Sequence, residues 1–437
     1  MEIMQTLKPF ESIWNFVLLL LVSYPILGAF AWFIGVLCYQ LIYRHRHKDD
    51  IEFQPLTPEE QPFITIMIPA HNEEVMIEHT INYLMNNLNY EKYEVLVTDD
   101  GSTDETPAIL ERLQSVYDNL RVVTIKKNQG KAHAFNVGVG FARGEFILSN
   151  DADSIPEPDA LWKYMSYFMG EEHANTAAVT ANMDVQNRST IIAKSQTVEF
   201  SSIVGVIKRS QVSALGNMYA YSGANTMYRR DALIDVGLFR QDRATEDISI
   251  AWDHQLNGWT TVFSPDILFY MNVPENLDAL YHQRKRWAKG GTEVLLTNFK
   301  RVVSHPGKYL KQWAFITDQT LSIIWSLFFF VSTLIFLILL VTFFFTGNYE
   351  RVYHMFCMAF IFVTFEMFAG VLQLLSALIV DDRGRKFKYL IFMPLYMLIY
   401  WQVNALALVT TLIPAVKTIL GYGSGTWVSP VRKHHTE

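Results

Sequence analysis

Long apolar runs flank a polar middle region of the chain. Residues 14–43 carry no charge, and three further runs follow the middle region: residues 313–347, 352–380 and 389–415. Within these three runs only Asp318 and Glu366 are acidic, and no lysine or arginine interrupts them. A helix needs about 20 apolar residues to cross the hydrocarbon core of a bilayer. The pattern therefore predicts four membrane spans, one before and three after the middle region.

The basic residues between the runs predict an orientation. A basic flank at residues 44–48 follows the first run, and a second basic cluster at residues 383–388 separates the third and fourth. Because basic loops stay in the cytoplasm, both clusters and the middle region are expected there. The basic tail at residues 432–435 conflicts with three later spans, which would place it outside. Either the last run is partly re-entrant or one span is misassigned.

Strand-like and helix-like patterns alternate in the middle region. Short β-branched apolar runs predict strands, and longer stretches between them predict helices. The expected strands are residues 63–68, 94–98, 121–125 and 145–149, and the expected helices are residues 73–88, 106–117 and 131–142. This alternation predicts an α/β domain with a mostly parallel sheet and helices on both faces. Ligands bind such sheets beyond the carboxyl ends of the strands.

Composition adds little to this pattern. Of the 437 residues, 50% are hydrophobic and 18% charged, below the roughly 25% charged residues of an average soluble protein. The apolar excess lies in the four runs, so the net charge of −7 says little about partners. Cys38 and Cys357 both lie inside apolar runs, which excludes a disulfide framework and a cysteine-based metal site.

The fourth expected strand ends at an acidic pair, Asp151 and Asp153, separated by one residue. Such a pair is often only a solvated turn. The functional alternative is a divalent cation, because Mg²⁺ and Mn²⁺ prefer carboxylate oxygens and keep positions open for phosphate. A cation would relieve the repulsion between the two carboxylates and neutralise charge on a departing diphosphate.

A second acidic pair, Asp99 and Asp100, ends the second expected strand. Three good helix N-caps follow it, so a turn before the next helix explains part of this motif. Two adjacent acids are better explained by a nucleotide, whose uracil and ribose offer N–H and hydroxyl donors to carboxylates. Lys131, after Gly130, either simply begins a helix or binds a diphosphate at the helix N-terminus.

Two later motifs also have two interpretations. Glu246 and Asp247 are helix-capping acids or include a general base that takes a proton from a sugar hydroxyl. Residues 283–287, sequence QRKRW, are interfacial anchors near the second span. Alternatively, Arg286 grips phosphate and Trp287 offers an apolar face to a sugar ring.

The ordered set of motifs resembles the processive family 2 glycosyltransferases, which include cellulose, chitin, hyaluronan and poly-N-acetylglucosamine synthases. The motifs are Pro69-Ala70-His71-Asn72-Glu73, Asp100-Gly101-Ser102, Asp151-Ala152-Asp153, Thr245-Glu246-Asp247 and Gln283-x-x-Arg286-Trp287. Residues 199–209, the Tyr221-Ser222-Gly223-Ala224 turn, residues 245–259 and residues 427–432 look most like bacterial poly-β-1,6-N-acetylglucosamine synthases. The gating-loop motif of cellulose synthases is not found, and residues 425–430 are a candidate replacement.

The resemblance implies a GT-A domain joined to a membrane-helix region, and it assigns the site. The implied domains are residues 1–50 (first span and flank), 51–310 (transferase) and 311–437 (later spans and tail). The implied UDP-sugar ligands are Ala70, His71, Glu73, Asp99, Asp100, Lys131, Asp151, Gln283, Arg286 and Trp287. Asp151 and Asp153 are the implied metal ligands, Asp247 the base beside Glu246, and Trp287, Ser222 and Gly223 the acceptor site.

The implied function is an inverting, multi-pass enzyme of the plasma (inner) membrane with its catalytic domain in the cytoplasm. It would use UDP-N-acetylglucosamine and Mg²⁺ or Mn²⁺ to extend a β-linked polymer, most simply β-1,6, and pass it across the bilayer. A small membrane accessory subunit is a further candidate partner, and no nucleic acid is expected. The alternatives are another product (hyaluronan, chitin or a lipid-linked sugar), a non-catalytic scaffold and a transporter.

Overall fold

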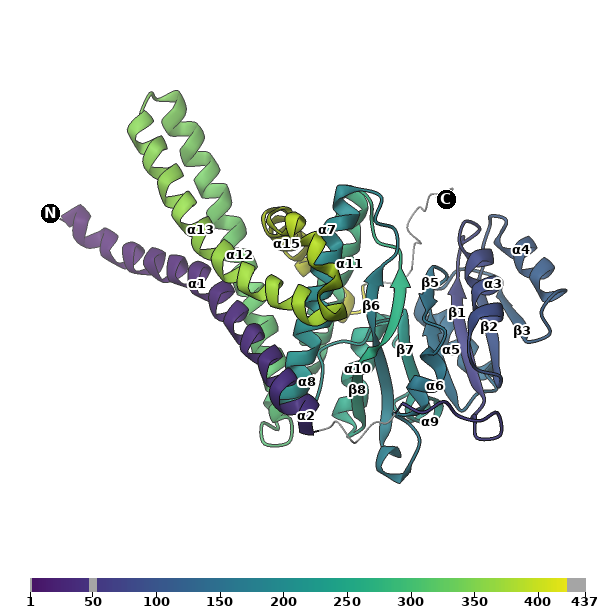
Figure 1. Cartoon of the computed structure of the whole chain (residues 1–437). Helices are drawn as coiled ribbons and strands as arrows, with labels where there is room; N and C mark the ends of the chain where they lie inside the picture. The colour runs from purple at the N-terminus through teal and green to yellow at the C-terminus, as the bar shows by residue number, and fades with distance from the viewer. Residues whose placement is uncertain (1, 47–52, 423–437) are drawn as a thin grey trace.

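The computed structural model describes residues 2–46 and 53–422. A mixed α/β domain forms one end of the molecule, and long helices project from the other (Figure 1). Residues 47–48 of the basic flank, the candidate replacement loop at 425–430 and the basic tail lie outside the described residues.

The expected alternation of strands and helices in the first half of the domain is confirmed. Its parallel strands are β1 (Ile64–Ala70), β2 (Tyr93–Asp100), β3 (Leu120–Ile125) and β4 (Phe146–Asn150). The helices between them are α3 (Ile77–Asn87), α4 (Thr106–Gln114) and α5 (Lys131–Phe141). Helix α3 begins four residues later than expected, because Glu74, Val75 and Met76 form a turn. This turn leaves room for the polar loop after β1.

The second half of the sheet is mixed, so the expectation of a mostly parallel sheet is wrong there. The strand order is β3-β2-β1-β4-β7-β6-β8-β5. The added strands are β5 (Ser154–Pro156), β6 (Thr176–Val185), β7 (Asn225–Arg229) and β8 (Thr260–Met271). Strand β7 runs antiparallel to both β4 and β6. The sequence pattern predicts alternating strands and helices only as far as β4. The long helices before β7 return the chain in the opposite direction.

Apolar cores cover both faces of the sheet. Alternate residues of β1 point to opposite faces: Ile64, Ile66 and Ile68 belong to one core, and Met67 belongs to the other. The first core packs under α3, α4 and α6 (Ala160–Met165), and the second under α5. This two-sided burial explains why the strand sequences are continuous apolar runs rather than alternating ones.

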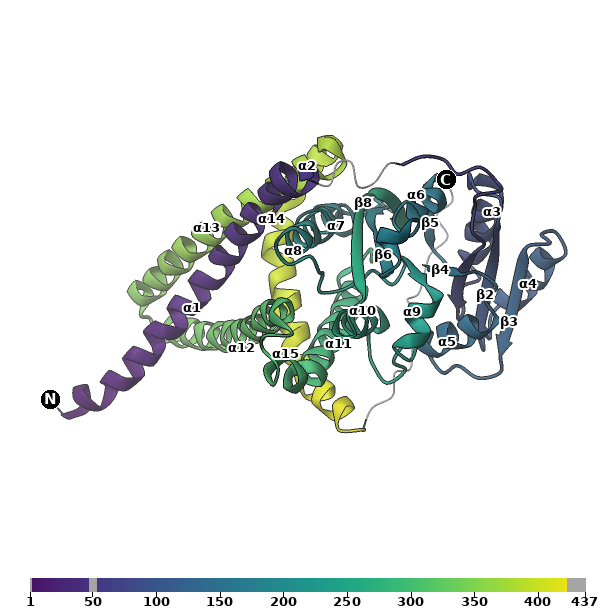
Figure 2. The same cartoon turned by 90° about the horizontal axis from the view of Figure 1, so that it is seen from below.

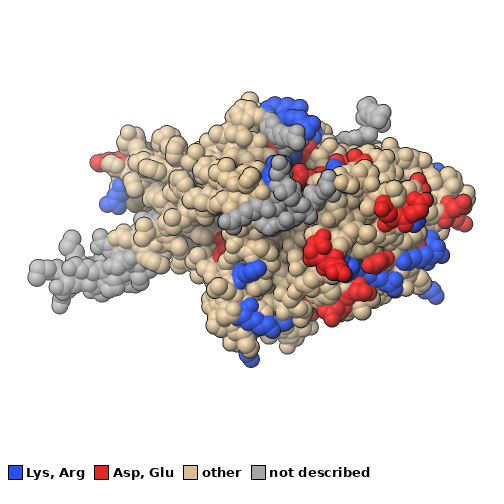
Figure 3. Space-filling view, turned by 60° about the horizontal axis from the view of Figure 1, so that its bottom comes forward, with Lys and Arg blue, Asp and Glu red and all other residues tan. Residues whose placement is uncertain are grey.

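Four segments are long and apolar enough to cross a membrane, as predicted: Asn15–Tyr43, Leu310–Phe345, Tyr349–Val380 and Arg385–Ile419. Helices α12 (Leu310–Phe345) and α13 (Tyr349–Val380) form a projecting hairpin (Figure 1). On the face seen in Figure 3, the projecting hairpin is largely uncharged and carries charged side chains at its far end. Lys311 and Asp318 are exposed near the other end of α12. The surface of the hairpin therefore matches a hydrocarbon environment.

The fourth segment differs from the other three. Its helix α15 (Trp401–Ile419) runs across the direction of α12 and α13 in both views (Figures 1 and 2). It packs along α11 (Leu277–Val303), with Ala405, Ala407 and Thr411 buried. Small residues allow two helices to approach closely. This segment is therefore held against α11 as well as being apolar.

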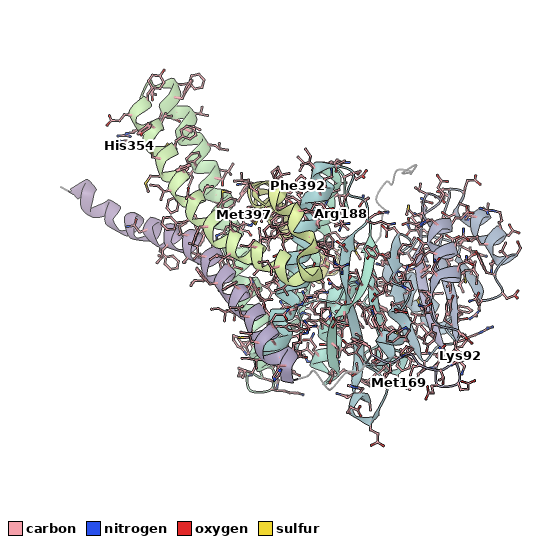
Figure 4. All side chains as sticks on the ribbon, viewed as in Figure 1. Lys92, Met169, Arg188, His354, Phe392 and Met397 are labelled. Carbon is pink, nitrogen blue, oxygen red and sulfur yellow. The ribbon has the colours of Figure 1, made fainter. Side chains whose placement is uncertain are left out.

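A group of buried charges, here called the docking cluster, fastens the segment after α13 to the end of β6. It consists of Asp184, Arg188, Asp381 and Lys386. The Nζ atom of Lys386 lies 2.8 Å from Asp381 Oδ2 and 3.1 Å from Asp184 Oδ1. Arg188 pairs with Asp184, and its guanidinium lies over the ring of Tyr389. In the view of Figure 4, Arg188 lies on the side of the domain toward the labelled residues Phe392 and Met397 of the C-terminal segment.

Candidate active site

Three charged side chains meet beyond the carboxyl end of β4. Asp151 follows this strand directly, Lys131 begins α5, and Glu246 begins α10 (Glu246–Leu256). The Nζ atom of Lys131 lies 2.7 Å from Asp151 Oδ1 and 3.2 Å from Glu246 Oε1. Parallel strands end at one edge of a sheet, which brings together residues that are far apart in the sequence. The structure thus joins three charged groups that the sequence predicted separately.

Gly223 lies at the centre of this group. An ideal Cβ atom on Gly223 would lie 3.2 Å from Glu246 Oε1, 3.3 Å from Asp247 Oδ2 and 3.3 Å from Lys131 Nζ. The backbone N–H of Gly223 donates to Asp247 Oδ2 at 3.0 Å, and the N–H of Ile248 donates to the other carboxylate oxygen at 2.9 Å. The absence of a side chain at Gly223 therefore allows three functional groups to converge on one point.

Burial sets the protonation of Asp247. Desolvation and the neighbouring Glu246 raise the pKa of Asp247 to about 6, although Lys131 and Arg286 act in the opposite direction. Burial alone would lower the pKa of Lys131, but the carboxylates of Asp151 and Glu246 raise it above its usual value. Asp247 is thus a carboxylate near the pKa that suits a general base at neutral pH, beside a permanently charged lysine.

The acidic pair at the end of β2 shapes the loops around it. Asp100 is fully buried, and its Oδ2 accepts the N–H of Gly130 at 2.8 Å. Asp99 accepts the N–H of Ser102 at 3.1 Å. These contacts hold the two loops together, and a direct contact of either acid with a nucleotide stays a prediction. The N-cap of α4 is Glu105 rather than one of the three expected residues, although Asp104 Oδ1 accepts the N–H of Thr106 at 3.0 Å.

The loop after β1 is tied to the loop after β2. Ala70 is the buried last residue of β1, and Nδ1 of His71 lies 2.9 Å from the carbonyl oxygen of Asp100. A carbonyl can only accept, so this nitrogen is the donor. The N–H of Glu73 donates to Thr106 Oγ1 at 2.8 Å. The two predicted nucleotide loops therefore form one connected wall of the site.

Asn72 contributes to this wall but was not singled out from the sequence. Its backbone has φ of 56°, a left-handed conformation that asparagine tolerates better than most residues. Its N–H donates to Ser102 Oγ at 2.9 Å, and its Oδ1 accepts the N–H of Thr103 at 2.8 Å. The position of Asn72, directly after a strand end and between two site residues, was the signal that could have identified it.

Helix α11 places the QRKRW motif of residues 283–287 close to Asp247. Gln283 and Trp287 are half-buried, and Arg286 is exposed but close enough to influence the charge of Asp247. An ideal Cβ on Gly290 would lie 1.9 Å from Thr245 Oγ1. Only glycine permits this approach, so α11 touches the start of α10 directly.

The turn before β7 forms the floor of the site. The N–H of Ser222 donates to Thr180 Oγ1 at 3.1 Å, and its hydroxyl donates to the sulfur of Met183. The hydroxyl of Ser149 donates to the carbonyl of Gly223. Ser222 and Gly223 are thus held by β6 and β4. Apart from Asp153, the predicted site residues lie on these loops and helices.

Asp153 is buried two residues beyond Asp151, in the turn between β4 and β5. Among residues 2–46 and 53–422, no group of three or more histidine, cysteine, aspartate or glutamate side chains forms a potential metal site. A cation here would receive only two carboxylates from the protein. This set fits Mg²⁺ or Mn²⁺, which commonly take one or two carboxylates and complete their shell with phosphate oxygens and water.

Sequence comparisons identify the protein family to which the chain belongs. The model of glycosyl transferase family 2 matches residues 65–237. A poly-β-1,6-N-acetyl-D-glucosamine synthase of Staphylococcus epidermidis is 33% identical over 96% of this chain and 98% of its own length. The chain therefore belongs to glycosyltransferase family 2, and the prediction that it is a sugar-transferring enzyme is confirmed.

Within that family the similarity is to one kind of synthase. A protein of the same name from Staphylococcus aureus (strain COL) is also 33% identical, over 94% of this chain and 97% of its own. The predicted resemblance to poly-β-1,6-N-acetylglucosamine synthases is thus confirmed over nearly the whole chain.

A solved structure confirms the fold class. The mannosyltransferase PcManGT from Pyrobaculum calidifontis, in complex with GDP-Man and Mn²⁺, superposes with a TM-score of 0.50 at 19% identity. The match covers 87% of this chain and 99% of that protein. The predicted combination of a GT-A domain with membrane-length helices is therefore observed.

Proposed function

We propose that this chain polymerises N-acetylglucosamine from UDP-N-acetylglucosamine into a β-1,6-linked exopolysaccharide by an inverting mechanism. The observation that carries the proposal is the convergence of Asp247, Glu246 and Lys131 on Gly223 beyond the strand ends. This point has a base and a cation in place but no side chain filling it. The names of the similar synthases support the sugar unit and the linkage. The UDP carrier rests on the resemblance to the processive family 2 glycosyltransferases.

Asp247 is the proposed base. The N–H groups of Gly223 and Ile248 fix the orientation of its carboxylate. It takes the proton from the hydroxyl of the terminal sugar as that oxygen attacks C1 of the donor. The C1–O bond to UDP breaks on the opposite face, which inverts the anomeric carbon and gives a β-linkage from an α-linked donor. Glu246 keeps the pKa of this base high.

Lys131 and Arg286 are the proposed cationic partners of the donor diphosphate. Lys131 stands at the N-terminus of α5, where backbone N–H groups also favour an anion. Asp151 and Asp153 would hold Mg²⁺ or Mn²⁺, which would neutralise charge on the diphosphate as UDP departs. The wall formed by Ala70, His71 and Glu73, with the loop of Asp99 and Asp100, would receive the uridine.

Trp287, Ser222 and Gly223 are the proposed acceptor site. The helix that carries Trp287 leads through residues 304–309 into the membrane hairpin. We therefore place the transferase domain in the cytoplasm and the exit of the polymer between the membrane helices. A small accessory subunit would bind on the membrane side.

The test is product analysis with purified protein in lipid nanodiscs. Labelled UDP-N-acetylglucosamine, UDP-glucose, UDP-glucuronate and UDP-N-acetylgalactosamine are supplied with Mg²⁺, and products are sized and digested with linkage-specific hydrolases. We expect a long product from UDP-N-acetylglucosamine alone, cleaved by a β-1,6-specific hydrolase and absent with excess chelator. Full turnover in chelator would overturn the metal role, and a product resistant to that hydrolase would overturn the linkage.

A further inference from the structure

Helix α11 carries a buried arginine, Arg284, between the motif residues. It is 3% exposed, and its guanidinium carbon lies 4.1 Å from the ring centroid of Trp287. That distance is well inside the roughly 6 Å range of a cation–π contact. Its Nη1 also donates to Gln283 Oε1 at 3.1 Å. Arg284 therefore touches two of the candidate site residues at once.

Glu199 holds Arg284 from another helix. Arg284 Nη2 donates to Glu199 Oε2 at 2.5 Å, and Glu199 is 2% exposed. Glu199 lies near the end of α7 (Ile191–Phe200), so this ion pair joins α7 to α11. The hydroxyl of Tyr400 lies 2.8 Å from Ser195 Oγ, which ties α7 to the C-terminal segment as well.

Stability alone explains this ion pair poorly. Removing two charges from water offsets much of their attraction, and apolar residues of similar volume often stabilise a fold equally well. Such a pair instead fixes the orientation of its two side chains. A planar guanidinium stacks on a ring and donates in fixed directions, whereas a lysine ammonium does neither. Here that fixed geometry acts on Trp287.

We propose that Glu199 and Arg284 are positioning residues for the acceptor sugar. Glu199 fixes the guanidinium of Arg284, and the guanidinium stacks on Trp287 and holds its indole ring as the platform for the terminal sugar of the polymer. This inference rests on the proposed function, to which the acceptor role of Trp287 belongs. A tilted platform would misplace the attacking hydroxyl relative to Asp247, and small misplacements of this kind are costly in rate.

The experiment compares Glu199→Gln and Arg284→Lys with the wild type. A short β-1,6-linked N-acetylglucosamine oligomer is the added acceptor, and UDP-N-acetylglucosamine is the donor. Two quantities are measured: KM for the acceptor, and the slow release of UDP by water when no acceptor is present. We expect the acceptor KM to rise about tenfold in both variants, the effect of losing one stacking contact. In Glu199→Gln, UDP release and the donor KM should stay within about twofold, because Arg284 still reaches Gln283. Arg284→Lys also removes the hydrogen bond to Gln283, an implied donor ligand, so this variant is judged by the acceptor KM alone.

Arg240→Lys is the matched control. Arg240 pairs with Asp253 through two hydrogen bonds of 2.8 and 2.7 Å, on the part of α10 remote from Gly223. Its acceptor KM should match the wild type.

The outcomes are separable. An unchanged acceptor KM in the folded variants, or UDP release in Glu199→Gln that falls by the same factor as transfer, overturns the positioning role. A wild-type protein that transfers no sugar to the oligomer overturns the proposed function instead. If Arg284→Lys does not fold, the near-isosteric Glu199→Gln decides by the same two measurements.

Discussion

The site cluster (Lys131, Asp151, Glu246, Asp247) and the docking cluster (Asp184, Arg188, Asp381, Lys386) use buried charge in opposite ways. In the docking cluster, two carboxylates meet two cations, and Asp381 also accepts from Asn182 and Ser201. In the site cluster, Lys131 pairs with Asp151 and Glu246, whereas Asp247 accepts two backbone N–H groups, and the charges of Lys131 and Arg286 only oppose the rise of its pKa.

The difference separates a structural charge group from a functional one. Balanced buried charges with satisfied hydrogen bonds hold two parts of a fold in one arrangement. A third carboxylate beside one closely paired lysine costs stability, since like charges disfavour one another. Such a group persists where a cation supplies further positive charge, which agrees with a divalent cation at the site.

Replacing the proposed base should give the largest effect. We expect Asp247→Asn to lower polymer synthesis by about 10²–10⁴-fold, the usual contribution of a general base. Its thermal unfolding temperature in detergent at pH 7.5 should change little, because the removal of a desolvated charge is offset by one backbone N–H group, of Gly223 or Ile248, that an amide nitrogen cannot accept. Asp253→Asn, on the same helix, is the control that should retain synthesis. Normal elongation by Asp247→Asn would contradict the assignment of Asp247 as the general base.

Breaking the docking cluster should lower the stability of the fold, whereas replacing Asp247 should lower synthesis. Lys386→Met leaves Asp184 and Asp381 without their shared cation, so unfolding should become easier by about 3–5 kcal/mol. Denaturant titration of the purified variant measures this loss. Adding Asp381→Asn should recover part of it, since one unpaired charge disappears. A double variant less stable than Lys386→Met would contradict a balanced cluster.

The pH dependence of synthesis sharpens the comparison further. The pKa of Asp247 is raised to about 6, so the base is ionised above that pH. The rate at saturating substrate should fall about tenfold for each unit below pH 6. The same raised pKa favours the folded state below about pH 4, and this contribution is lost as pH rises to about 6. Asp247→Asn should remove that slope from a stability profile, while Lys386→Met should keep it.

An exposed ion pair provides the smallest expected effect. Arg112 and Glu78 pair at 2.7 Å with side chains 57% and 41% exposed. Solvent screens such pairs, so Arg112→Gln should leave both the unfolding temperature and synthesis unchanged. A clear loss of either would mean that charge burial is the wrong criterion for separating these groups.

The sequence predicted the parts of this molecule that depend on local patterns. The apolar runs indicated all four membrane-length segments, and the strand ends pointed to Asp151, Asp100 and Ala70. Antiparallel β7 could not be predicted, because strand direction depends on where the preceding helices return the chain. The role of Asp100 at the loop of Gly130 was equally hidden, since capping and ligand binding call for the same carboxylate.

The pair of Glu199 and Arg284 could not be predicted for another reason. These residues are 85 positions apart, and only tertiary packing brings α7 and α11 together. Gly223, in contrast, was predicted as part of the acceptor turn. The structure shows in addition that side-chain atoms of Glu246 and Asp247 from α10 and of Lys131 from α5 converge on it.

The contact of Gly290 with Thr245 has a mechanical consequence. Helix α11, which carries Trp287, touches the start of α10, which carries Asp247, and α11 leads through residues 304–309 into the membrane hairpin. A tilt of that hairpin can therefore be transmitted to Asp247 through this contact. A change in lipid thickness or lateral pressure should therefore alter the position of Asp247 relative to the sugar, with no separate regulatory domain involved.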